Sequence, residues 1–368
     1  MTGDAGDMRN TGWKIAGVAS FLLHYSGGLR LFERIDRGRE ATPRCTVLSY
    51  HRVADEQPGY RDVAVAPDTF RAHIAYLVRR DYSFLSLAEY HEYLRGERRL
   101  DSDCVLITFD DGYRDNYAAA FPVLRDAGIP AAVFLCTGAL EEGPPLWWDR
   151  VAGAVRSLRA AGVRSAPAGT GLPPHVAAAL LPGLTAGDRR ASLAIGDLVD
   201  LLKTAEPEER DRVLTALEHL APLAHAGGLM MTWDMAREMH AGGIAFGAHS
   251  VSHPAFSRLS TQEALGEIVG SKAAIERELG EDVTAFAYPY GKEDFLGTLT
   301  AESLREAGIQ WAYTTENGLN DPGAPPLELR RNGMRDVPTY VLAARLSGIF
   351  EHPALARLRA RMEGRRSS

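Results

Sequence analysis

Residues 105–136 have the sequence VLITFDDGYRDNYAAAFPVLRDAGIPAAVFLC, which contains one complete structural unit. The apolar run 105–109 has the length and side-chain types of a buried β-strand. A helix is predicted over 116–127, because Gly128 follows it and glycine is the usual residue just past a helix end. A second apolar run follows at 131–136. A strand, a helix and a strand in succession predict two parallel strands of one sheet.

The same unit recurs along the chain from about residue 45. Further strands are predicted at 46–50, 244–248, 283–287 and 310–314, with helices at 233–241, at 261–279 and ending near Ala307. Ser260 and Glu263 form a capping box that opens the helix at 261–279. This alternation predicts an α/β fold with a parallel sheet, either doubly wound or closed as a barrel. Functional residues are then expected at the carboxyl ends of the strands.

The region between residues 141 and 228 has no strand pattern and is rich in Ala, Leu and Arg. We predict a helical insertion there, acting either as a lid over a substrate groove or only as a covering of the barrel. The predicted organisation is an N-terminal helical segment at 1–44, barrel parts at 45–140 and 229–345, the insertion at 141–228, and a basic C-terminal tail at 346–368.

The composition limits the classes of ligand. The chain has 48 acidic and 41 basic residues, which gives a net charge of −7. An acidic chain is a poor candidate for non-specific binding to nucleic acid or another polyanion, so we expect no nucleic-acid partner. Cys45, Cys104 and Cys136 are odd in number and lack metal-binding spacing, which predicts buried thiols of a reducing compartment.

No stretch reaches the roughly 18–20 apolar residues that a membrane-spanning helix needs. The apolar run at 15–23 also lacks a basic leader and a convincing cleavage site. We therefore expect a cytoplasmic protein, with export as the alternative. An amphipathic helix at 13–35 either packs on the domain or makes a peripheral contact with a membrane.

Asp110 and Asp111 stand side by side at the end of the strand at 105–109, and Gly112 follows them. Two adjacent carboxylates repel each other, and a bound cation compensates for this when one carboxylate ligates it. The other carboxylate then stays free to accept a proton. Gly112 allows the backbone to turn sharply at this point. An Asp-Asp-Gly turn on the protein surface is the alternative interpretation.

His249 and His253 directly follow the strand predicted at 244–248. Imidazoles four residues apart lie on one face of a helical turn and converge on one ion. Two imidazoles and one carboxylate leave positions open for water and substrate, as catalytic zinc sites do. The same ligand set also holds non-haem iron, so we expect a divalent metal, with Zn²⁺ favoured and Co²⁺, Ni²⁺ or Fe²⁺ as alternatives.

A third motif, Tyr288-Pro289-Tyr290-Gly291, follows the strand predicted at 283–287. Proline and glycine fix an unusual turn there, which can aim the backbone N–H of Tyr290 into the site. Such an N–H group can bind the oxyanion of a tetrahedral intermediate.

These three motifs, in this order, resemble those of the polysaccharide deacetylases of carbohydrate esterase family 4, which share the NodB-type homology domain. The likeness covers about residues 45–340 and implies a distorted (β/α)7-type barrel, here with the helical insertion. By this resemblance Asp110 is the general base, Asp111, His249 and His253 hold the metal, and Tyr290 lends its N–H group to the oxyanion.

The chain departs from the family pattern at two places. Ala287 stands where many members carry an arginine, and the late Leu-x-x-His motif that supplies the general acid is not found. Instead, His51 ends the first strand. This resembles the circularly permuted members that deacetylate exported poly-N-acetylglucosamine, in which the late motif comes first. His51 is then the expected acid for the leaving amine; the alternative is that it only caps a strand.

Three further residues are expected around the substrate. Pro289 belongs to the third motif, and Trp148 offers an aromatic face that suits a sugar ring, although such a residue is more often part of the core. Arg331 is a candidate to orient Asp110 in place of the missing arginine, with Arg330 as an equal alternative.

The site residues therefore predict a metal-dependent hydrolase, and the resemblance implies that it removes N-acetyl groups from amino sugars of a bacterial polysaccharide or its precursor. A deformylase or ring-opening amidase of the same fold is one alternative, and a sugar-binding protein without activity is another. The joint presence of Asp110, Asp111, His249 and His253 argues against the latter.

Overall fold

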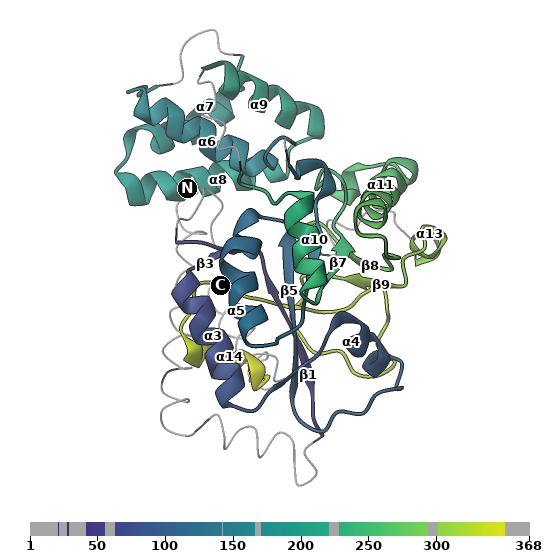
Figure 1. The fold of residues 1–368 in the computed structure, drawn as a ribbon. Coiled ribbons are helices and arrows are strands. Elements are labelled where there is room, and N and C mark those ends of the chain that lie inside the picture. The colour runs from purple at the N-terminus through teal and green to yellow at the C-terminus, as the bar shows by residue number, and fades with distance from the viewer. Residues whose placement is uncertain are drawn as a thin grey trace, which may run out of the picture.

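The computed structural model describes residues 21, 28, 42–55, 63–141, 143–165, 171–220, 228–292 and 301–349 (Figure 1). Apart from Phe21 and Gly28, the helix predicted at 13–35 lies outside the described residues, as does the basic tail from residue 350 onward. Within the described part of the chain, no helix combines the length and the apolar character needed to cross a membrane.

A parallel sheet forms the centre of the fold. Its strands lie in the order β10 (Asn332–Gly333), β1 (Cys45–Tyr50), β5 (Cys104–Asp111), β6 (Ala131–Leu135), β7 (Ile244–Ala248), β8 (Ala285–Ala287) and β9 (Trp311–Tyr313), and β4 (Ser83–Phe84) also pairs with β5. Every pairing is parallel. A separate short pair joins β2 (Arg52–Val53) to β3 (Ala64–Val65). The α/β fold class and the predicted strands are thus confirmed.

A short segment leading into β10 connects the two edges of the sheet. Leu329 exchanges backbone hydrogen bonds with Ala312 and Thr314, at 2.9 and 2.7 Å, beside β9. On the other side, the N–H group of Met334 donates to the carbonyl of Ser49 in β1 at 2.7 Å. The sheet therefore bends round into a distorted barrel, as the resemblance implied.

Helices flank the sheet (Figure 1). They are α3 (Pro67–Arg79), α4 (Leu87–Leu94), α5 (Phe121–Asp126), α10 (Trp233–Ala241), α11 (Thr261–Leu279), α13 (Ala301–Glu306) and α14 (Thr339–Leu346). α11 begins at the predicted capping box, in which the side chain of Ser260 accepts from the N–H of Glu263 and the carboxylate of Glu263 accepts from the N–H of Ser260. It ends at Gly280, whose φ of 74° is left-handed.

The helix predicted at 116–127 is not a regular α-helix. It opens with a π-helical turn at Asn116–Ala120, and the N–H group of Phe121 donates to the carbonyl of Asn116. Pro122, at the start of α5, has no N–H group to donate and its ring clashes with a regular preceding turn. The wider π-helical turn accommodates the proline ring. At the start of this turn, the side chain of Asn116 donates to the carbonyl of His51 at 2.7 Å.

In the region of the predicted insertion, the described residues form the helices α6 (Trp147–Ala160), α7 (Pro174–Thr185), α8 (Asp188–Lys203) and α9 (Pro207–Leu220). They gather at one end of the molecule (Figure 1). Arg150 of α6 pairs with Glu218 of α9 at 2.7 Å, which ties the first and last of these helices together.

Buried side chains cover both faces of the sheet. On one face Val47, Leu106 and Phe134 pack with residues of α4, and the other face packs against the flanking helices. Gly247 is required on β7, because a Cβ atom there would lie 2.5 Å from the ring of Phe134. All three cysteines are buried and free, as predicted.

α4 contributes a buried histidine to this core. The ring of His91 stacks on Trp311 with centroids 4.3 Å apart, and its Nε2 atom is 2.8 Å from the hydroxyl of Tyr313. Burial, and then the charge of Arg95, lowers the pKa of His91 to about 3. His91 is therefore neutral in the folded protein at ordinary pH.

This low pKa makes the stability of the fold depend on pH. The unfolded chain, where the pKa of histidine is about 6.5, binds the extra proton first as the pH falls. We expect His91 to lower the free energy of unfolding below that pH, by up to about 1.4 kcal/mol per pH unit. His91→Gln should remove this contribution. Denaturant unfolding of both proteins between about pH 7 and pH 5 measures it, and parallel pH profiles would contradict the assignment.

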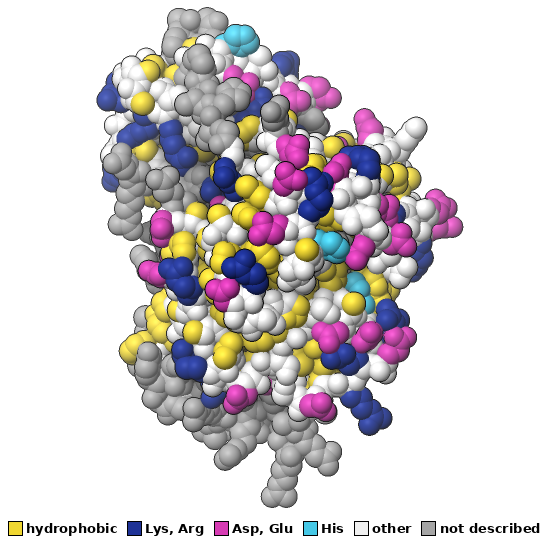
Figure 2. Space-filling view, in the orientation of Figure 1, with side chains coloured by type: hydrophobic (Ala, Val, Ile, Leu, Met, Phe, Trp, Pro, Cys, Tyr) yellow, Lys and Arg dark blue, Asp and Glu magenta, His cyan; other side chains and the backbone are white. Residues whose placement is uncertain are grey.

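The described side chains on the face drawn in Figure 2 mix both signs of charge. Lysine and arginine are interspersed with aspartate and glutamate, and neither sign forms a continuous patch there. Polyanions bind clustered basic residues. This face therefore offers no such surface.

Candidate metal centre

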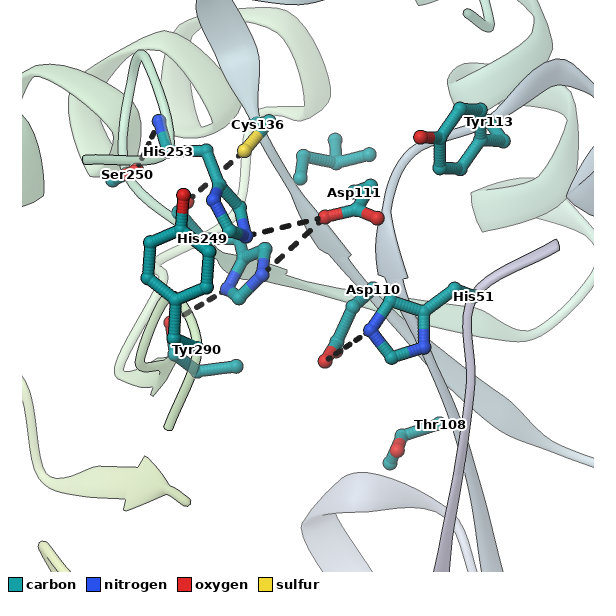
Figure 3. A network of polar contacts seen from close by, with 12 residues as sticks. His51, Thr108, Asp110, Asp111, Tyr113, Cys136, His249, Ser250, His253 and Tyr290 are labelled. Carbon is teal, nitrogen blue, oxygen red and sulfur yellow. Dashed lines mark hydrogen bonds and ion pairs between the residues drawn. The ribbon is translucent and has the colours of Figure 1, made fainter. Parts of the chain in front are cut away.

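The carboxyl ends of neighbouring parallel strands bring the predicted site residues together (Figure 3). Asp110 and Asp111 end β5, and His249 directly follows β7. His51 comes directly after β1. Because all strands of a parallel sheet end at the same edge, side chains far apart in the sequence meet there.

Asp111, His249 and His253 form a compact buried cluster. One ligand atom from each lies within 4.8 Å of the others. The Oδ1 atom of Asp111 is 3.5 Å from Nε2 of His249 and 3.6 Å from Nε2 of His253. The three residues are only 2–5% exposed.

The spacing of this cluster fits a metal ion. The separations exceed the 2.7–3.2 Å of an N–H···O hydrogen bond, and Oδ1 of Asp111 is buried with no hydrogen-bond partner among the described residues. Ligands at about 2.0–2.1 Å from a tetrahedral metal are separated by about 3.3 Å. The buried Asp-His-His triad is thus a candidate metal site.

The loop that carries the two histidines differs from the prediction. Residues 249–253 do not form a helical turn, because Ser250 and His253 have left-handed φ angles of 70° and 56°. The N–H group of His253 donates to the hydroxyl of Ser250 at 2.9 Å, which stabilises the compact loop. The histidines therefore converge through a tight irregular loop, and the helical turn was a wrong prediction.

Glu267 of α11 holds this loop through hydrogen bonds to its backbone and to Ser252. Its carboxylate accepts from the backbone N–H groups of Val251 and Ser252, both at 2.8 Å, and from the Ser252 hydroxyl at 2.7 Å. A single glutamate on an amphipathic helix gives no sequence signal for such a role.

His249 is oriented by a backbone carbonyl. Its Nδ1 atom is 2.7 Å from the carbonyl oxygen of Ala287. Because a carbonyl only accepts, Nδ1 carries the proton and Nε2 stays available as a ligand. Burial acts to lower the pKa of His249, but the charges of Asp110 and Asp111 outweigh it and the pKa is raised.

Arg331 grips the neighbouring carboxylate, Asp110. Its two terminal nitrogens lie 2.7 and 2.8 Å from the two carboxylate oxygens, and its Nε donates to the carbonyl of Thr314 at 2.9 Å. Burial would raise the pKa of Asp110, but the charges of Arg331, His249 and His51 outweigh it and hold this pKa well below its ordinary value. Asp110 is therefore ionised.

The structure decides between the two arginines that the sequence left open. Arg331 is 0% exposed, whereas Arg330 is exposed. The predicted orienting role thus falls to Arg331. A contact of Arg331 with a sugar, also predicted, does not fit its burial, because the guanidinium is occupied by protein acceptors.

His51 lies beside Asp110 and is partly exposed. Its Nε2 atom is 4.0 Å from Oδ2 of Asp110, and its side chain is 27% exposed. Figure 3 shows the imidazole facing this carboxylate. The site thus combines a buried ionised carboxylate, an accessible imidazole and a candidate metal triad.

The third motif forms the next wall of the site. Tyr290 has a left-handed φ of 61°, and its ring packs edge-on against His253 with centroids 4.7 Å apart. A Cβ atom on Gly291 would lie 2.5 Å from the backbone N of Thr315, so only glycine fits there. Pro289 is buried. The contact of Pro289 with substrate and the oxyanion role of the Tyr290 N–H group stay predictions.

Trp148 is part of the wall of the site and not an exposed platform. It is 7% exposed, and its Nε1 donates to the hydroxyl of Tyr113 at 2.8 Å. That hydroxyl in turn donates to Asp149 at 2.9 Å. Burial raises the pKa of Asp149 to about 7. No sequence pattern pointed to Tyr113, although it follows Gly112 of the Asp-Asp-Gly motif.

Comparisons with known proteins find likenesses to polysaccharide deacetylases. Residues 97–166 and 211–312 match the family model described as polysaccharide deacetylase. The poly-beta-1,6-N-acetyl-D-glucosamine N-deacetylase of Escherichia coli (strain K12) is 36% identical over 84 residues, which are 23% of this chain and 12% of that protein. The protein of the same name from Staphylococcus epidermidis is 33% identical over 102 residues, 24% of this chain and 35% of that protein. The matched part thus spans about a third or less of these relatives.

Two solved structures share the fold. IcaB from Ammonifex degensii superposes with a TM-score of 0.52 at 22% identity and covers 83% of this chain and 97% of its own. The Streptococcus pyogenes deacetylase PplD, in complex with acetate, gives a TM-score of 0.53 at 18% identity and covers 82% and 97%. At such identities the likeness concerns the fold alone.

Proposed function

We propose that the chain is a polysaccharide deacetylase, the family whose model matches residues 97–166 and 211–312, and that it hydrolyses the N-acetyl groups of amino sugars in a bacterial polysaccharide or its precursor. The observation that carries the proposal is the buried triad of Asp111, His249 and His253 beside the ionised Asp110. A sugar-binding protein without activity would have no use for a buried base held by an arginine.

Asp111, His249 and His253 would hold a divalent metal, for which we favour zinc. When bound, such a metal makes water more acidic and polarises a carbonyl oxygen. A carboxylate and two imidazoles suit Zn²⁺, and the same donors accept Co²⁺, Ni²⁺ or Fe²⁺.

Asp110 and His51 transfer the protons in the proposed reaction, and Tyr290 stabilises the charge that develops. Asp110, kept ionised by Arg331, accepts a proton from the attacking water as its oxygen adds to the acetyl carbon. The carbon–nitrogen bond then breaks, and His51 protonates the leaving nitrogen. The backbone N–H of Tyr290 stabilises the oxyanion. The products are acetate and a free amino sugar.

Two relatives named as poly-beta-1,6-N-acetyl-D-glucosamine N-deacetylases support a polymer of N-acetylglucosamine as the substrate. The acidic net charge of −7 also favours a neutral polymer over a polyanion. We propose that the chain is a permuted exopolysaccharide-type member, because its candidate acid His51 precedes the other motifs.

This role of His51 leads to a prediction. His51→Ala should lower kcat by roughly 10²-fold, because the leaving amine loses its proton donor, while metal content stays unchanged. Steady-state kinetics with metal analysis of the same sample checks this. An Ala variant with undiminished kcat would remove His51 from the mechanism.

Acetate release from a panel of substrates tests the function itself. The panel contains N-acetylated β-1,6-glucosamine and chitin oligomers, an O-acetylated sugar, and small formyl and cyclic amides. We expect release from the N-acetylated oligomers, which chelation abolishes and zinc restores. If only the small amides were hydrolysed, the proposed polysaccharide substrate would be wrong. If every substrate were bound but none hydrolysed, the proposal that the protein is a hydrolase would be wrong.

A further inference from the structure

His253 differs from His249 in how its ring is held. Metal-binding histidines normally donate their second ring N–H to a nearby acceptor, which fixes the ring. His249 does so through the carbonyl of Ala287. The Nδ1 atom of His253 is buried and has no hydrogen-bond partner in another described residue. Within the described part of the chain, the ring of His253 is therefore held by packing contacts.

Aromatic side chains surround the ring instead. Trp148 and Tyr290 both pack edge-on against His253, with centroids 4.6 and 4.7 Å away and interplanar angles of 78° and 87°. His249 lies on a further side at 4.9 Å. Such edge-to-face contacts have defined geometry and contribute about 0.5–1.5 kcal/mol each beyond burial.

We call Trp148 and Tyr290 the two aromatic walls of His253. Both are held by residues in the first turn of α6. Nε1 of Trp147 donates to the hydroxyl of Tyr290 at 3.0 Å. Nε1 of Trp148 donates to the hydroxyl of Tyr113, which donates to Asp149. Tyr113 stands two residues after Asp111. Three consecutive residues of one helical turn thus connect both walls of His253 with the strand that carries the third ligand.

Two other insertion helices, α8 and α9, contact Tyr290 and Trp147. The guanidinium carbon of Arg210 in α9 lies 5.1 Å from the centroid of the Trp147 ring. Nζ of Lys203 at the end of α8 lies 4.4 Å from the centroid of the Tyr290 ring. Cations over aromatic faces are attracted at these distances. The packing of the insertion therefore reaches the metal centre.

We infer that the helical insertion is part of the metal centre, with Trp148 and Trp147 as positioning residues that fix the ring of His253 in place of a hydrogen bond. This inference rests on the metal site of the proposed function. On this inference, the helices do more than cover the barrel.

Metal affinity of the purified full chain tests the inference without any substrate. Zinc dissociation constants come from competition with a chelator, and the absorption spectrum of the Co²⁺-loaded protein reports the ligand geometry. We expect Trp148→Ala to weaken zinc binding by about 10–100-fold and to alter the cobalt spectrum. Trp148→Phe keeps an aromatic edge and should recover most of the affinity.

Arg150→Gln is the matched control, because it breaks the ion pair of α6 with Glu218 and keeps both tryptophans with their hydrogen-bond partners. It should leave the zinc affinity and the cobalt spectrum unchanged. A folded Trp148→Ala protein with wild-type affinity would overturn the inference. So would an equal loss of affinity in Arg150→Gln, since the effect would then be one of general packing.

Trp147→Phe and Tyr290→Phe provide a second test, in which an aromatic ring remains at both positions. Each removes one partner of the same hydrogen bond, so we expect each to weaken zinc binding several-fold and the double variant to be no weaker than either single variant. Additive losses would show that the bond plays no part. All readouts are metal binding, so inactivity on sugar polymers would overturn the proposed substrate and leave this inference standing.

Discussion

Asp110→Asn should lower kcat by about 10²- to 10⁴-fold while the protein keeps its full metal content. The substitution preserves the shape of the side chain and removes the group that accepts the proton of water. Metal content should persist because the candidate ligands are Asp111, His249 and His253. Acetate release under saturating substrate, with metal analysis of the same preparation, measures both quantities.

Asp111→Asn is the matched control for Asp110→Asn, since the two residues are adjacent and differ only in role. It should lose metal, whereas Asp110→Asn should not. Loss of metal in Asp110→Asn, or activity close to wild type, would contradict the role of Asp110. Because Arg331 loses its carboxylate partner, near-ultraviolet circular dichroism should verify that the variant is folded at the assay temperature.

Arg331→Met should destabilise the fold by about 3–5 kcal/mol and lower activity as well. The substitution keeps much of the side-chain volume but leaves Asp110 buried, at 1% exposure, without its bidentate partner. Removing one member of a buried ion pair costs this much because the other charge stays desolvated. Denaturant unfolding of the metal-free proteins measures the difference in the free energy of unfolding.

The loss in Arg331→Met should also depend on pH. In the wild type, the pKa of Asp110 is depressed, so its contribution to stability is present at neutral pH and is lost as the pH falls. Without the guanidinium, burial raises this pKa above that of the unfolded chain, and the carboxylate becomes costly as the pH rises. The destabilisation should therefore be larger at about pH 7 than at about pH 5. Arg330→Met, at an exposed neighbour, should show neither effect.

Much of the fold was predictable because its signals are local. α11 begins and ends at the residues that the sequence predicts. Its start is set by the capping box of Ser260 and Glu263, and its end by Gly280. β7 likewise matches the apolar run at 244–248. Strand ends that carry Asp110, Asp111 and His249 were predicted to meet, because a parallel sheet allows no other arrangement.

The remaining features depend on contacts that no local pattern encodes. The loop at 249–253 has left-handed φ angles at Ser250 and His253. Glycine would indicate such angles in the sequence, and neither residue is a glycine. Whether Arg330 or Arg331 meets the base depends on the register of β10 on β1. Glu267 acts through the backbone of a loop about 15 residues earlier in the chain. Only the tertiary fold brings these groups together.

The segment that closes the barrel also links folding of the chain to formation of the catalytic base. Asp110 and its guanidinium partner are separated by 221 residues, and the partner arrives with β10, the last strand in the described part of the chain. A nascent or partly unfolded chain can form β5 early, but its carboxylate then lacks the charge that keeps it ionised in a dry interior. Ring closure and maturation of the base are therefore a single event, and an intermediate with an open barrel would be inert.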